Sequence, residues 1–98
     1  MRWFKFKPPD KKRPVLILTR TSAIEYLGEV TVAPVTSTIR DIPSEVHLSR
    51  TDGMPRGCAV NLDHIQTVSK GKIGSLITEL SPKKLPALRR ALSFALDL

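Results

Sequence analysis

The chain has 98 residues, the size of one small domain with a modest hydrophobic core. Its 16 lysines and arginines outnumber nine acidic residues, which gives a net charge of +7 and a pI near 10.1. This balance favours a polyanionic partner and leaves nucleic acid, an acidic protein segment and an anionic membrane surface eligible. No apolar stretch approaches the roughly 20 residues of a membrane span, and no signal-peptide core is present, so we expect a soluble, cytoplasmic protein.

The cysteine content argues against a disulfide-stabilised domain and against a zinc-binding domain. Cys58 is the single cysteine, so an internal disulfide is impossible. A zinc site would need both histidines plus carboxylates at no recognised spacing, and we expect no metal or other cofactor. The apolar residues that follow Cys58 favour an inert, buried thiol over a nucleophile.

The first predicted strand lies near the N-terminus, where aromatic residues alternate with lysines over positions 3–7. Two prolines then end it, because proline donates no hydrogen bond to a neighbouring strand. The branched apolar run at 15–18 predicts a central strand that follows a cationic run and Pro14 directly. A charged Arg13 is therefore expected at the mouth of a buried strand.

Three features follow in the middle of the chain. Residues 29–33 alternate with period two and predict a strand, which Pro34 should bend or free. Residues 42–48 alternate again, and the segment 51–55 has the composition of a turn. We therefore expect two strands here, separated from the rest by a tight turn.

Further short strands are predicted over 57–62, 65–68 and 74–80. Five to seven short strands joined by turns are typical of a small barrel or a strongly coiled sheet.

The pattern changes to a helical period at the C-terminus. Ser81 is a suitable cap, Pro82 suits the first helical position, and apolar residues then recur every three or four positions. Pro86 should make the first turn irregular, because it lacks the N–H that would bond to the carbonyl of residue 82. The predicted fold class is α+β: mainly β, with an amphipathic C-terminal helix packed on the sheet.

The order and spacing of several segments resemble the MazF/PemK family of toxin endoribonucleases. The segments are KRPVLIL at 12–18, VAPVTSTIR at 32–40, IPSEV at 42–46, DGMPR at 52–56 and VNLDHIQTV at 60–68. The resemblance covers about residues 11 to 98 and implies a single domain, 1–98, whose first strand is short or clipped. It implies a small SH3-like barrel of the CcdB/MazF type, with short helices and the C-terminal helix.

The resemblance also implies an activity and partners. Members of the family form homodimers and cut single-stranded RNA at short sequences without a metal, leaving 2′,3′-cyclic phosphate and 5′-OH ends. An antitoxin with an acidic, flexible tail inhibits them, and such a tail suits a protein of charge +7.

Two residues match the positions that carry catalysis in the family. Arg13 matches the family's Arg-Pro and would stabilise the charge on the reacting phosphate, since its planar fork can hold two phosphoryl oxygens. An arginine side chain is a poor general base, so no proton abstraction is assigned to it. Thr36 is the first hydroxyl after Pro-Val and would position the phosphate or the 2′-OH, although the alternative of a turn-satisfying hydroxyl stays open.

Five residues are predicted to bind the substrate, and no general base is identified. The five are Lys12, Ser37, Asn61, Asp63 and Gln66. Asp63 is the candidate proton acceptor, but it could equally accept a hydrogen bond from a base edge or from Arg13. Gln66 stands where family members usually carry arginine. Both histidines, His47 and His64, are interpreted as surface residues.

Two other functional classes remain open. A catalytically silent nucleic-acid-binding module would explain the charge, although only five aromatic residues argue against an extended stacking surface. A gyrase poison of the CcdB kind would explain the fold without requiring Arg13 and Thr36.

Overall fold

The structure is a computed structural model that describes residues 1–5 and 12–98, so the predicted strand residues at 6 and 7 lie outside the described part. Its main element is one antiparallel sheet of seven strands. The strands are β1 (Arg2–Lys5), β2 (Lys12–Ile17), β3 (Glu29–Thr36), β4 (Glu45–Leu48), β5 (Cys58–Asn61), β6 (Gln66–Ser69) and β7 (Ile73–Leu76). They pair in the order β4-β5-β3-β2-β1-β7, with β6 joined to β3. The predicted α+β class is confirmed.

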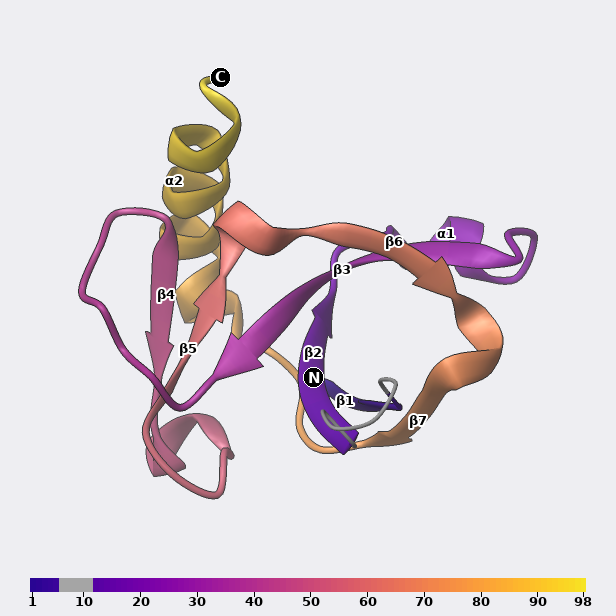
Figure 1. Ribbon diagram of the computed structural model, residues 1–98, viewed down its shortest axis with the longest axis horizontal. Coiled ribbons are helices and arrows are strands. Elements are labelled where there is room, and N and C mark those ends of the chain that lie inside the picture. The colour runs from indigo at the N-terminus through magenta and orange to yellow at the C-terminus, as the bar shows by residue number, and fades with distance from the viewer. Residues whose placement is uncertain (6–11) are drawn as a thin grey trace.

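Strand β3 connects the two halves of the sheet. Its first four residues pair with β6, its middle pairs with β2, and Val35 and Thr36 pair with β5. In Figure 1, β1, β2, β3, β6 and β7 curl into a ring, while β4 and β5 stand to one side with the C-terminal helix. Pro34 does not free the strand: it lies opposite Val15, and β3 continues past it to Thr36. At this point β3 changes its neighbour from β2 to β5, so the N–H that proline lacks is not needed for pairing.

The helices are short, except at the C-terminus. They are α1 (Thr21–Ile24), α2 (Leu85–Leu96) and four 3₁₀ turns, η1 (Arg50–Asp52), η2 (Leu62–His64), η3 (Lys70–Lys72) and η4 (Pro82–Lys84). The expected irregular first turn is η4, which precedes α2 and is capped by Ser81 accepting a hydrogen bond from the N–H of Lys83 at 3.3 Å. The helix α1 was not predicted. No helix in the described ranges is long and apolar enough to cross a membrane.

Two hydrophobic clusters support the sheet. The larger lies under α2 and includes Val60 and Leu62, which are fully buried, together with Ala91 from the helix. The smaller fills the ring and contains Phe4, Val15, Val30 and Val32. Because β3 supplies side chains to both clusters, the end of this strand is held rigidly.

Candidate active site

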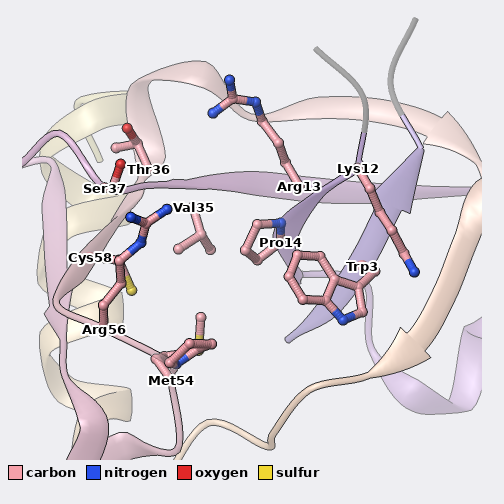
Figure 2. A pocket seen from close by; sticks show the side chains of 11 residues that line it. Trp3, Lys12, Arg13, Pro14, Val35, Thr36, Ser37, Met54, Arg56 and Cys58 are labelled. Atoms are coloured by element: carbon pink, nitrogen blue, oxygen red, sulfur yellow. The ribbon is translucent and has the colours of Figure 1, made fainter.

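A pocket of about 560 Å³ lies beside β1, β2 and the end of β3, next to the chain that leads into β5. Its size is in the range of about 300–1,000 Å³ that is usual for ligand sites. Figure 2 shows the side chains around it. The lining residues are Trp3, Lys12, Arg13, Pro14, Val35, Thr36, Ser37, Met54, Pro55, Arg56 and Cys58.

The β1–β2 pair supplies one side of the pocket. Trp3 lies opposite Pro14 in the register, and Lys12 and Arg13 begin β2. The Lys12 ammonium lies 5.6 Å from the centroid of the Trp3 ring, a cation–π distance. Arg13 is exposed, and Figure 2 shows its side chain extending over the rim of the pocket. Arg13 thus lies inside β2, two residues before the buried Val15, and not in a loop ahead of the strand.

The end of β3 supplies two hydroxyl groups. Thr36 is half-buried and Ser37, the residue after it, is exposed. The Thr36 hydroxyl oxygen accepts a hydrogen bond from the backbone N–H of Thr38 at 3.1 Å. A hydroxyl that accepts in this way keeps its own proton, which it can donate to a phosphoryl oxygen.

A tight turn presents the opposite side of the pocket. Gly53 follows η1 with φ +89°, in the left-handed region that favours glycine, and a Cβ there would lie 2.5 Å from Thr78 Oγ1. The Arg50 Nε–H also donates to the Pro55 carbonyl at 3.2 Å. These contacts fix the path of the chain through Met54 to Arg56.

Arg56 is a cationic lining residue that was not among the predicted site residues. In Figure 2 its side chain reaches from the lower edge of the pocket toward Thr36 and Ser37. The sequence signal was present, since Arg56 closes the DGMPR segment. A residue after a turn has no predictable direction until tertiary structure fixes the turn.

The floor of the pocket is apolar. Met54 and Cys58 are buried, and Pro14 and Val35 lie between the two arginines in Figure 2. Burial raises the pKa of the Cys58 thiol, with Asp52 adding to the effect and Arg56 opposing it. The thiol is therefore protonated at neutral pH, as the prediction of an inert, buried cysteine requires.

The predicted site residues divide into two groups. Lys12, Arg13, Thr36 and Ser37 line the pocket together, although Lys12 and Thr36 are 24 positions apart in the sequence. The other three, Asn61, Asp63 and Gln66, are not in its lining.

Local contacts explain where these three residues lie. The buried Asn61 caps η2 by accepting a hydrogen bond from the Asp63 N–H at 3.0 Å. The Asp63 carboxylate accepts a hydrogen bond from the hydroxyl of the buried Ser44. Gln66 is exposed and lines a smaller hollow of about 310 Å³ with Lys5 and Lys72.

The electrostatics of the pocket suit an anion. Three cations line it, Lys12, Arg13 and Arg56, and no carboxylate is among its described lining residues. Within residues 1–5 and 12–98, no group of three or more His, Cys, Asp or Glu side chains is placed to hold a metal ion. Fold and site together define a small α+β protein. Its pocket combines guanidinium groups and hydroxyls, a combination suited to phosphate.

Comparisons with known proteins give the family. Residues 3–96 match the model of the PemK-like, MazF-like toxins of type II toxin-antitoxin systems. The chain is 40% identical over 89 residues to endoribonuclease MazF3 of Mycobacterium tuberculosis, covering 91% of this chain and 86% of that protein. It is also 40% identical over 87 residues to the probable endoribonuclease MazF5 of the same species, covering 88% and 80% of the two chains.

Solved structures agree with the sequence comparison. The Mycobacterium tuberculosis toxin MazF-mt6 superposes with a TM-score of 0.89 at 37% identity, covering 100% of this chain and 98% of that one. A mycobacterial endoribonuclease in complex with its cognate antitoxin superposes with a TM-score of 0.84 at 26% identity, covering 99% and 92%. The chain belongs to the PemK-like, MazF-like toxin family, and the prediction of an endoribonuclease toxin is confirmed.

Proposed function

We propose that the protein cuts single-stranded RNA at specific short sequences, without a metal, in the pocket that contains Arg13 and Thr36. The observation that carries this proposal is the convergence of a guanidinium from β2 and a hydroxyl from the end of β3 on one cationic pocket. Single-stranded RNA fits better than a duplex, because only an unpaired base can leave the stack and enter a pocket of this kind.

The chemistry is transfer of a phosphoryl group within the RNA. The ribose 2′-oxygen attacks the adjacent phosphorus, the bond to the 5′-oxygen breaks, and the products are a 2′,3′-cyclic phosphate and a 5′-OH. The 2′-OH loses its proton and the leaving 5′-oxygen gains one. Negative charge builds on the non-bridging oxygens, where the fork of Arg13 binds it more strongly than in the ground state.

Thr36 orients the reacting group in this proposal. Because its oxygen already accepts from the Thr38 N–H, its proton points to a phosphoryl oxygen or to the 2′-oxygen. Neither a carboxylate nor an imidazole is among the described lining residues, so the pocket accelerates the reaction by charge stabilisation and orientation.

The remaining predicted contacts form the RNA-binding surface around this centre. Lys12 and Ser37 lie in the pocket and would bind RNA directly. Asp63 and Gln66 are exposed and would contact nucleotides further along, while the buried Asn61 would hold η2 in place beneath them.

A cleavage assay with a chelator tests the proposal. We expect purified protein with long single-stranded RNA and EDTA to produce discrete cuts whose downstream fragments carry 5′-OH ends. Mapping the 5′ ends, with and without prior phosphorylation by a polynucleotide kinase, distinguishes these ends from 5′-phosphates. RNA that stays intact at high protein concentration would rule out the activity and leave a gyrase poison or a silent binding module.

We also propose that the protein acts in the cytoplasm as a homodimer inhibited by an acidic antitoxin. Apolar side chains of α2 are exposed on the single chain, with Phe94 at 61% and Leu96 at 46%, and dimerisation would cover them. The net charge of +7 and the cationic pocket favour an acidic inhibitor.

Light scattering tests the assembly. We expect a particle of twice the 10.9 kDa chain mass, and a heavier complex after an acidic antitoxin is added. A Phe94→Glu variant should shift the particle toward the monomer, because burying a charged carboxylate in an apolar contact is costly. A wild-type protein that stays monomeric at micromolar concentration would disprove the dimer.

A further inference from the structure

The side chain of Arg56 lies at the pocket and, within the described residues, makes no polar contact that stabilises the fold. It is exposed, and in the described part of the chain its guanidinium makes no side-chain hydrogen bond or ion pair. Other basic side chains nearby are engaged: Arg50 donates to the Pro55 carbonyl, and the Lys84 ammonium lies 3.8 Å from an Asp52 carboxylate oxygen. The side chain of Arg56 is therefore available for a ligand, while its backbone is held by the turn.

The turn before Arg56 restricts where its guanidinium can reach. Gly53 is in a conformation that other residues rarely adopt, against Thr78, and the Thr78 hydroxyl donates to the Asp52 carbonyl at 3.4 Å. Two residues after Arg56, the buried Cys58 begins β5 and pairs with Leu48 of β4. Because the backbone is anchored on both sides of Arg56, little backbone entropy is lost when its side chain binds a ligand in the pocket.

Arg56 and Arg13 approach the pocket from different sides. In Figure 2 Arg56 lies to the left of Val35 and Arg13 extends at the top, while the apolar side chains of Pro14, Val35 and Met54 line the space beside them. An apolar floor does not bind phosphate, but it can receive the face of a nucleobase, which is apolar and flat. The two cations and the apolar surface of the pocket follow the same order as phosphate, base and phosphate in one nucleotide step.

We propose that Arg56 binds the RNA phosphate next to the one that is cut, so that the nucleotide between the two phosphates rests on the apolar floor. This inference rests on the proposed function, and it assigns Arg56 to substrate binding and leaves the reacting phosphate to Arg13 and Thr36. Arg56 then increases the affinity of the protein for RNA and fixes which nucleotide lies at the cleavage site. It has little effect on the chemical step.

The salt dependence of binding provides the test. Each phosphate contact to a single strand contributes about −0.7 to the slope of log K against log[salt]. We expect Arg56→Gln to make that slope shallower by about 0.7 and to weaken binding about five-fold at 0.1 M salt. Fluorescence anisotropy would measure this with an RNA whose cleavage-site ribose carries 2′-O-methyl, which prevents cutting.

Two further variants separate the charge at this site from charge elsewhere. Arg56→Lys should keep the slope of the wild type, because an ammonium still releases a counterion. Arg89→Gln removes one charge from the exposed surface of α2, outside the pocket lining, and should keep both the slope and the cleavage rate. Thermal melts of all variants check that they are folded.

Single-turnover cleavage at saturating protein distinguishes binding from catalysis. We expect the Arg56→Gln rate to stay within about three-fold of wild type, since saturation compensates for weaker binding. A wild-type slope for Arg56→Gln, or a rate as low as that of an Arg13→Ala variant, would overturn the proposal. Wild-type protein that leaves unmodified RNA intact would refute the proposed function alone, because the binding experiment does not depend on cutting.

Discussion

Replacing Arg13 by alanine is expected to lower RNA cleavage by about 10³-fold or more while leaving the protein folded. Removal of one preorganised donor at a developing oxyanion typically costs about 10²–10³ in rate, and removal of an arginine at a transferring phosphoryl group costs about 10³–10⁵. The expected loss is large because Arg13 is proposed to hold two oxygens of the reacting phosphate at once.

Stability should change little in the same variant. The Arg13 side chain is exposed, and the core residues of β2 are Val15 and Leu16. Surface substitutions of this kind usually change the free energy of unfolding by less than about 0.5 kcal/mol. A thermal melt beside a single-turnover cleavage assay would measure both quantities.

A lysine variant separates the effect of the planar, two-pronged guanidinium from the effect of its positive charge. Arg13→Lys keeps a cation but loses the planar fork, so we expect it to restore little of the activity. Arg20→Ala is a matched control, because Arg20 is also exposed and lies outside the pocket lining. If Arg13→Ala cut RNA at the wild-type rate, the assignment of Arg13 would be wrong.

Replacing Thr36 by valine is expected to lower the single-turnover rate by about 10²-fold. Valine has nearly the same shape as threonine, so it keeps the packing at the end of β3 but removes the donor. The Thr38 N–H loses its acceptor in the variant, yet it lies in an exposed segment where water can replace the bond.

A Thr36→Ser variant completes this comparison. Serine keeps the hydroxyl and lacks only a methyl group, so it should retain activity within about ten-fold of wild type. Near-wild-type rates for both the valine and the serine variants would show that the hydroxyl only satisfies the turn, the alternative that the sequence left open.

Much of the fold was predictable because its signals are local. The period-two patterns and turn residues placed the strands, and the cap at Ser81 with Pro86 predicted the irregular start of the C-terminal helix. The helix α1 was missed because four residues are too few to show a helical period. The continuation of β3 through Pro34 was missed because a strand that changes partners can tolerate a missing donor.

The candidate site was predictable only in part. Sequence order placed Arg13 before a buried strand and Thr36 at the end of another, and both line one pocket. Asp63 was predicted as a candidate base, and the structure adds that its carboxylate accepts a hydrogen bond from Ser44, 19 positions away. No pattern along the chain could show a bond across that separation.

The amino-acid sequence by itself determined the family, the α+β class and the strongly basic charge, and it supplied the cationic and hydroxyl side chains from which the proposed phosphate site is built. Only the tertiary structure decided which of those residues share a pocket. It brought Arg56 beside the site and placed Asn61 in a buried cap outside the pocket lining. The physical reason is that spacing and composition set local conformation, whereas the direction of a side chain depends on packing between segments far apart in the chain.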